Sequence, residues 1–99
     1  MSELPTIGNY MDYSSRNYGV NSLYFSCGRM TVYFSYSTPV AFEDDHGITV
    51  RENVWGPTTG KHINSIDDGD KKARINSDAF EQQLQDAITR LGFTLPHVA

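Results

Sequence analysis

The segment Thr58-Thr59-Gly60-Lys61-His62 combines residue types that bind anions in proteins. A glycine between hydroxyl side chains and a lysine lets backbone N–H groups converge on an anion. The lysine adds a positive charge, and the threonine hydroxyls and a protonated histidine add hydrogen-bond donors. The first glycine and the following helix of a Walker A motif are missing, so the similarity to a phosphate-binding loop is chemical only. A solvent-exposed turn explains these residues equally well.

A second set of polar and aromatic residues shares the non-core side of the expected strands: Arg51, Asn53, Tyr24, Tyr33 and Tyr36. An arginine among tyrosines pairs with an anion and stacks on a planar ring. Tyrosine rings also stack on nucleic-acid bases. Two other interpretations carry equal weight, namely a half-exposed surface held by cross-strand pairs and a dimer interface.

Other reactive side chains show no recognisable catalytic or metal-binding pattern. The acidic runs at 43–45 and 67–70 lack the ligand spacing of an EF-hand and are expected to be solvated turns. The histidines lack the spacing of a zinc site, and no G-x-S-x-G motif is present. His62 with Asp67 or Asp68 would make a general-base pair, although nothing in the spacing requires it. We expect no metal, no cofactor and no catalytic residue, and we interpret Trp55 as a core anchor.

Composition places the chain among small soluble domains. Its 99 residues predict a single domain over 1–99, and association into oligomers would help so short a chain. A net charge of −4 and a pI of about 5.1 argue against a surface that tracks duplex DNA, but not against a small anion pocket. One cysteine, no membrane-length apolar run and no signal-peptide pattern predict a cytoplasmic protein.

The chain then divides into an irregular arm over 1–17, antiparallel strands over 20–54 and a C-terminal helix. Gly28-Arg29 predicts a tight hairpin turn in which Cys27 faces Met30 and Phe25 faces Val32. These apolar residues share one face, and a hydroxyl-rich face with tyrosines lies opposite.

A second hairpin is expected around the polar turn at 43–47. Pairing Phe42 with Ile48 and Val40 with Val50 puts all four on the apolar face, which leaves Arg51 with the tyrosines. The sheet is therefore predicted to have one apolar and one polar side.

The stretch 56–70 is rich in Gly, Thr, Asn and Asp and is interpreted as a functional loop, and 71–75 as a short link or a fifth strand. Apolar residues at helical spacing predict a helix over 77–91, capped by Asn76 or Ser77. The predicted fold is α+β, an antiparallel meander of four to five strands covered on one face by this helix.

Three segments carry a family resemblance: S-R-N-Y-G-V-N at 15–21, Y-F-S-Y-S-T-P-V-A-F at 33–42 and R-E-N-V-W-G-P-T-T-G-K-H-I-N at 51–64. They resemble a family of short, uncharacterised proteins found in phages and other mobile elements, whose last motif reads N-x-W-x-x-T-T-G-K-H-L-N. This chain departs from that motif at Ile63. The resemblance spans about residues 15–70 and implies a phage-encoded protein in the host cytoplasm. It also implies a shared site that includes 35–39 and the loop.

Together these features predict a binding protein rather than an enzyme. Its expected ligand is a phosphate-bearing small molecule, such as a nucleotide or a nucleotide-derived immune signal, whose sequestration would counteract host defence. A protein-interaction or single-stranded nucleic-acid-binding regulator is the alternative, and a small hydrolase that uses His62 is a third.

Overall fold

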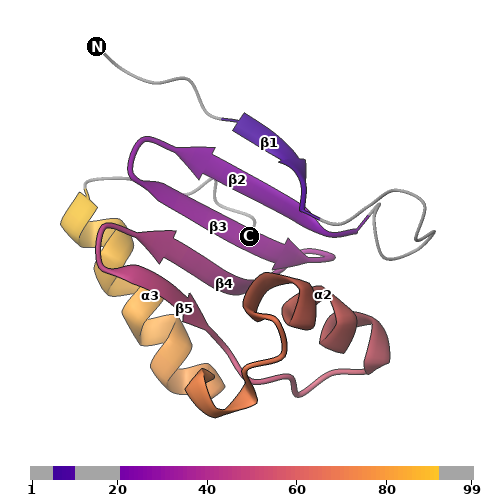
Figure 1. The fold of residues 1–99 in the computed structure, drawn as a ribbon. Coiled ribbons are helices and arrows are strands. Elements are labelled where there is room, and N and C mark those ends of the chain that lie inside the picture. The colour runs from indigo at the N-terminus through magenta and orange to yellow at the C-terminus, as the bar shows by residue number, and fades with distance from the viewer. Residues whose placement is uncertain (1–5, 11–20, 92–99) are drawn as a thin grey trace.

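The computed structural model describes residues 6–10 and 21–91, which form a five-stranded antiparallel sheet and two α-helices. The strands follow one another across the sheet in chain order (Figure 1). This α+β meander confirms the predicted fold class. The elements are β1 (Thr6–Asn9), β2 (Leu23–Cys27), β3 (Met30–Ser35), β4 (Thr38–Asp44), β5 (Gly47–Val50), α2 (Pro57–Asp67), η2 (Lys71–Ala73) and α3 (Ser77–Leu91).

Strand β1 corrects the prediction of an irregular N-terminal arm. Residues 6–9 pair with β2, with Ile7 opposite Phe25. This four-residue strand contains a glycine and is too short to show the alternation of apolar and polar residues that predicts a strand. Its extended conformation is stabilised by pairing with β2. The rest of the arm, at 1–5 and 11–17, lies outside the described residues.

The β2–β3 hairpin follows the sequence prediction. Cys27 pairs with Met30 and Phe25 with Val32, and Gly28 has the positive φ of 62° that the turn requires. Met30 and Val32 are buried in a core cluster with Phe42 and residues of α3. The turn residues alone therefore fix the register of this hairpin and the face that it buries.

The predicted β4–β5 register is wrong by one residue. Thr49, not Ile48, pairs with Phe42, and Val50 pairs with Ala41 rather than Val40. The turn is shorter than expected, because Asp44 and Gly47 already pair and the Asp44 carboxylate accepts a hydrogen bond from the backbone N–H of His46. A one-residue shift exchanges the two faces of a strand. Arg51 consequently lies on the α3 side of the sheet and not with the tyrosines.

A bulge in β4 also changes which side chains are buried together. Phe34 pairs with Pro39 and Tyr33 with Ala41, so Val40 is an extra residue in the ladder. Val40 and Ala41 both join a second core cluster with Val50 and Ile63. The sheet is therefore apolar on both sides, and the predicted wholly polar face does not form.

The expected loop at 56–70 is mostly the helix α2, which begins after Gly56 with a proline at its first position. Its buried residues, Thr59, His62 and Ile63, recur at helical spacing, but two of the three are polar. The periodicity was hidden because the face that packs on the sheet is itself hydrophilic.

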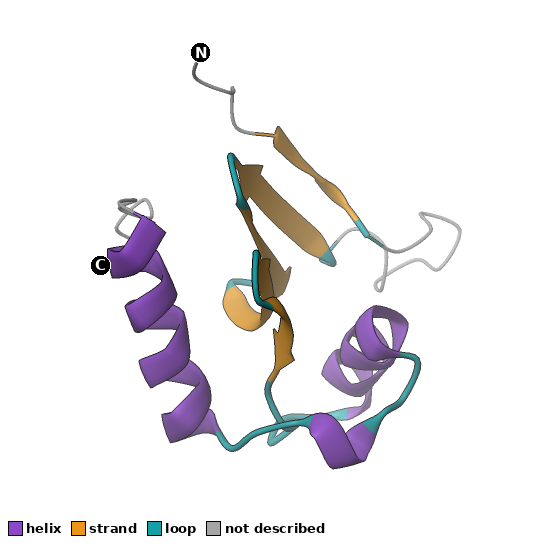
Figure 2. Cartoon of the chain, turned by 60° about the vertical axis from the view of Figure 1, so that its left-hand side comes forward, coloured by secondary structure: helices purple, strands orange, loops and turns teal. Residues whose placement is uncertain are grey.

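Two helices cover opposite sides of the sheet, as Figure 2 shows. The residues that α3 buries, Phe80, Leu84 and Ala87, pack on Met30, Val32 and Phe42, and the side chain of Asn76 accepts a hydrogen bond from the N–H of Ala79 at its start. The segment 71–75, expected to be a short link or a fifth strand, consists of η2 and one parallel bridge between Ile75 and Arg51, so no full fifth strand forms there. No helix in the described ranges is long and apolar enough to cross a membrane.

Candidate functional site

A cleft of about 320 Å³ lies beside α2, where the chain leaving β5 and the chain around η2 approach that helix. We call it the α2 cleft. Five of its six lining residues are polar or charged, and they come from three segments, with Glu52 and Asn53 after β5, Gly60 and Asn64 on α2, and Lys71 and Arg74 around η2. Gly60 and Asn64 are four residues apart and so share one face of the helix.

The Arg74 side chain joins two walls of the α2 cleft. Its guanidinium donates hydrogen bonds to both carboxylate oxygens of Asp67, at 2.8 and 2.9 Å, and to the side-chain oxygen of Asn64 at 2.8 Å. The Arg74 and Asp67 side chains are only 5% and 9% exposed. The hydrogen bond from Arg74 holds the pKa of Asp67 below its usual range, so both charges persist at neutral pH and largely cancel.

The α2 cleft retains two charged side chains that this pairing does not neutralise. Within the described ranges, neither Glu52 nor Lys71 makes a side-chain hydrogen bond or ion pair. Their backbones are nevertheless fixed, because the N–H of Glu52 donates to the carbonyl of Ile75 and that of Lys71 to the carbonyl of Gly69. The cleft therefore offers one cation and one anion on ordered backbone.

Gly60 permits the close packing at the other end of the α2 cleft. A Cβ at this position would lie 3.0 Å from the side-chain nitrogen of Asn53. Two hydrogen bonds fix the Asn53 side chain in this position. Its amide nitrogen donates to the carbonyl of Gly56, and its side-chain oxygen accepts from the backbone N–H of Trp55. A glycine within a helix costs about 1 kcal/mol relative to alanine, and here it makes room for this asparagine.

The opposite face of α2 carries a buried polar cluster. The Ser35 hydroxyl lies 2.9 Å from the Thr59 hydroxyl and 2.7 Å from Nδ1 of His62, and all three residues are buried. The rings of Tyr10 and Tyr36 lie against His62. Tyr36 is held with a φ of 58°, which is unusual for a residue with a side chain. The cluster joins the 33–42 and 51–64 segments, but it leaves no open position for a ligand at His62.

Arg51 is buried on the other side of the sheet, where it is only 4% exposed. Its guanidinium carbon lies 5.0 Å from the centre of the Trp55 ring and 4.9 Å from that of Phe80. It also donates to the carbonyl of Pro39 and forms an ion pair with Glu81 of α3. The predicted arrangement of Arg51 among tyrosines is therefore absent, because the register shift turned this side chain toward α3. Trp55 is not a buried anchor, since it is 44% exposed and covers Arg51.

The tyrosines of the predicted second set are divided among different contacts. Tyr24 pairs across the sheet with Tyr33 and closely approaches the backbone of Gly8. Tyr33 packs against the second core cluster and donates its hydroxyl to Glu43. Burial raises the pKa of the Tyr33 hydroxyl, and the Glu43 charge adds to that effect. Tyr36 is exposed beside His62.

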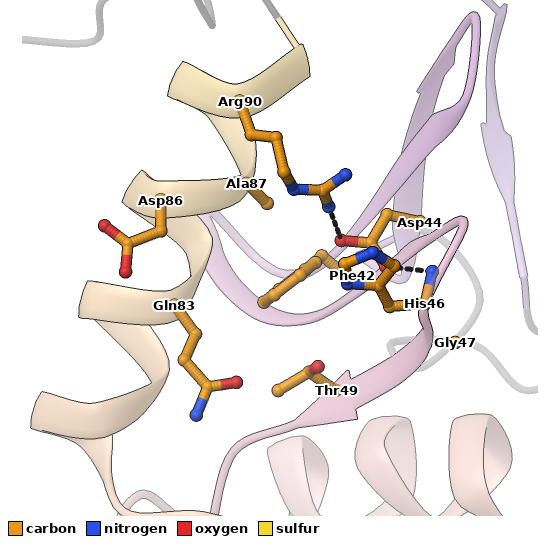
Figure 3. A pocket seen from close by; sticks show the side chains of 9 residues that line it. All are labelled: Phe42, Asp44, His46, Gly47, Thr49, Gln83, Asp86, Ala87 and Arg90. Atoms are coloured by element: carbon orange, nitrogen blue, oxygen red, sulfur yellow. Dashed lines mark hydrogen bonds and ion pairs between the residues drawn. The ribbon is translucent and has the colours of Figure 1, made fainter.

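A second cleft, of about 210 Å³, separates α3 from the β4–β5 hairpin (Figure 3). Phe42 and Ala87 contribute apolar surface, and Asp44, His46, Thr49 and Arg90 are among the polar residues around it. Asp44, Asp45 and His46 are close enough to share a metal ion, with ligand atoms within 4.8 Å of one another. Arg90, however, already forms ion pairs with both carboxylates, at 2.8 and 3.0 Å. The cation that these carboxylates bind is therefore the Arg90 guanidinium of the protein itself.

Comparison with protein families matches residues 6–82 to the model of a family of unknown function, DUF8033. The chain belongs to that family. The comparisons with curated proteins and with solved structures give no match. The match to DUF8033 covers every residue of the α2 cleft, whereas four residues of the second cleft lie beyond it: Gln83, Asp86, Ala87 and Arg90.

In this DUF8033 member, the α2 cleft contains two of the residues that we singled out from the sequence, Gly60 and Asn53. Thr59 and His62 face the sheet instead, while Lys61 is exposed and Thr58 is half-buried on α2. The other four cleft residues were not among those predicted from the sequence: Glu52, Asn64, Lys71 and Arg74. The available signal was the four-residue spacing of Gly60 and Asn64, which has meaning only once the segment is a helix.

Proposed function

We propose that this protein binds a small phosphate-bearing ligand in the α2 cleft and acts by sequestering it. The main support is the Lys71 ammonium, which has no partner in the described ranges and lies in a polar cleft with two asparagine side chains. Asn64 adds a donor, because its oxygen is taken by Arg74 while its amide N–H groups remain available. A cation with neighbouring amide donors is suited to phosphate oxygens.

The size and chemistry of the α2 cleft favour binding over catalysis. Its volume of about 320 Å³ is at the lower end for small-molecule pockets, which range from roughly 300 to 1,000 Å³. No histidine, cysteine or serine lines it, and His62 is fully buried on the far face of α2. A hydrolase that uses His62 is accordingly not supported by these positions.

Thermal unfolding against a nucleotide panel tests the proposal. The panel comprises ribonucleoside mono-, di- and triphosphates, cyclic dinucleotides and inorganic phosphate. A ligand at a hundred times its Kd adds about 2.7 kcal/mol, which raises the Tm by roughly 10–20 °C in a domain of this size. Lys71→Ala should weaken binding about tenfold, equivalent to about 1.4 kcal/mol.

Lys72→Ala is the matched control, because it removes the same charge from the next residue, which does not line the cleft. It should leave the affinity within about twofold of the original protein. The proposal is wrong if no member of the panel stabilises the protein. It is also wrong if the two lysine variants lose affinity equally, because the effect would then be general electrostatics.

The biological form of the proposal is that a phage-encoded chain removes a nucleotide-derived immune signal from the host. The resemblance of the 33–42 and 51–64 segments to short phage proteins supports this setting. Mass spectrometry of the material released when the purified protein is heated tests it directly. A phosphorylated small molecule released in near-stoichiometric amount from the original protein, and not from Lys71→Ala, is the expected result. Equal release from both proteins would contradict it.

Protein interaction is the second candidate, favoured by one observation. Val54 and Trp55 are adjacent apolar residues that are 60% and 44% exposed. Exposed aromatic residues of this kind are enriched at protein interfaces. If they bind a host protein, Val54→Ser should abolish co-purification of that partner, and Ile48→Ser, at another exposed apolar position, should not. If a partner protein co-purifies equally well with both variants, Val54 and Trp55 do not form its binding surface.

A further inference from the structure

Strand β1 forms an open edge of the sheet. In the described part of the chain it pairs with β2 alone, so its outer row of backbone N–H and C=O groups has no strand beside it (Figure 1). Proteins commonly protect such an edge with a lysine, a proline or a bulge, because an unprotected edge pairs with another chain. Apart from its length of four residues, Thr6–Asn9 has none of these protections, since it contains no proline and no charged side chain and its register with β2 is regular.

The opposite edge of the sheet is partly covered by the chain itself. At the end of β5, the N–H of Ile75 donates to the carbonyl of Val50, and the N–H of Glu52 donates to the carbonyl of Ile75. This parallel bridge uses backbone groups that would otherwise be available to another strand. One open edge and one covered edge favour pairing of β1 with β1, an isologous contact that closes as a dimer and does not grow into a fibre.

The open edge is already fixed in an extended conformation. The Tyr24 ring lies against Gly8, where an added Cβ would be only 2.8 Å from it. Just after the strand, Tyr10 donates its backbone N–H to the carbonyl of Ser22 and its hydroxyl to the carbonyl of Phe34. A partner strand therefore meets a preorganised edge, which reduces the entropy lost on pairing.

The side chains at this edge suit a second copy of the chain. Ile7 pairs with Phe25 and Phe25 with Val32, so all three share the face of the sheet on which α3 packs. Val32 is buried in the α3 cluster, whereas Phe25 is half-buried and Ile7 is 69% exposed. Neither β1 nor β2 contains a charged residue, so two copies with a net charge of −4 each can pair here without placing like charges opposite each other.

We propose that two copies of this chain associate by antiparallel pairing of β1 with β1, which joins their sheets into one. Around a two-fold axis, each residue of β1 pairs with a residue on the same face of the sheet, so Ile7 lies opposite or diagonal to its counterpart and is buried by it. The α2 cleft takes none of its lining residues from β1 or β2, so each copy keeps its own cleft. The dimer is therefore independent of the ligand proposed above.

Sedimentation equilibrium of the full chain tests this pairing. The apparent mass of the original protein should rise with concentration from 11.1 kDa toward twice that value. Ile7→Lys places a charge opposite or diagonal to its own copy and should weaken the dimer at least about tenfold. Ile48→Lys is the matched control, because Ile48 is also an exposed isoleucine, at 47%, but lies on β5 at the other edge. It should leave the dissociation constant within about twofold of the original.

Folding and location of the contact are checked separately. If Ile7→Lys fails to fold, Thr6→Lys, at an exposed position on the other face of β1, should weaken the dimer in the same way. The β1 amides should also exchange more slowly with solvent in concentrated than in dilute protein. A chain that stays monomeric up to its solubility limit overturns the proposal. So does a dimer that the lysines on β1 weaken no more than Ile48→Lys, or one that gives the β1 amides no added protection.

Discussion

Replacing Ser35 by alanine tests how the buried polar cluster holds α2 against the sheet. The Ser35 hydroxyl makes two hydrogen bonds, at 2.9 Å to Thr59 and 2.7 Å to His62, and is itself 2% exposed. A buried polar group that loses its partner costs about 1–3 kcal/mol. With two such groups affected, we expect a loss of about 3 kcal/mol in the free energy of unfolding. For a chain of this size, that corresponds to a fall of about 12–24 °C in Tm.

Urea unfolding and hydrogen exchange provide the assay, and Ser37→Ala is the control. Ser37 lies two residues after Ser35, in the β3–β4 turn, and is exposed, so its substitution should change stability by less than about 0.5 kcal/mol. Amides of α2 should exchange faster in Ser35→Ala, because the hydroxyl links that helix to β3. Combining Ser35→Ala with Thr59→Val should cost less than the sum, since one bond is counted twice. If Ser35→Ala is no more destabilising than Ser37→Ala, the cluster does not hold the helix.

Three further changes probe the other contacts. Asp67→Asn should remove about 2 kcal/mol at neutral pH. The folded pKa of Asp67 lies below its ordinary value of 3.8. The ionised carboxylate therefore stabilises the folded protein above pH 3.8, and this stability is lost as the pH falls through the folded pKa. The free energy of unfolding of Asp67→Asn, measured in urea, should consequently depend less on pH below about 4 than that of the original protein. Gly60→Ala should give none of the usual gain of about 1 kcal/mol in the original protein but recover it when Asn53 is also alanine, as thermal unfolding would show. Arg51→Ala should cost about 2–3 kcal/mol and shift the emission of Trp55, the chain's one tryptophan, to longer wavelength; an unchanged spectrum would contradict the stacking.

Sequence patterns were sufficient where a local rule decides the structure. Gly28 fixes the first hairpin, because a positive φ is required there and the register follows from the turn. The α3 helix is also determined locally, by apolar residues at helical spacing and a side-chain cap from Asn76. These two elements supply most of the first core cluster, and they explain why the fold class was predicted correctly.

The second hairpin shows where local reasoning is insufficient. The residues 43–47 permit both a long turn and a short one, and both place apolar residues on one face. The short turn prevails in a structure where Val50 packs with Ile63 of α2 and Arg51 reaches Phe80 of α3. The sequence pattern of β5 does not reveal which helix packs on each of its two faces. Choosing between the registers therefore requires knowledge of what covers each face.

The T-T-G-K-H segment depends most on the tertiary structure. Its composition predicted a polar segment that forms hydrogen bonds, and Thr59 and His62 do form them. Tertiary packing made it a helix, because Thr59 and His62 find hydrogen-bond partners in Ser35 on the sheet and can be buried at little cost. That burial turns Gly60 and Asn64 toward the α2 cleft, where Lys71 and Arg74 approach from a later part of the chain. Residue types alone determine which groups can bind a ligand, whereas the pairing of buried polar groups decides which of them face it.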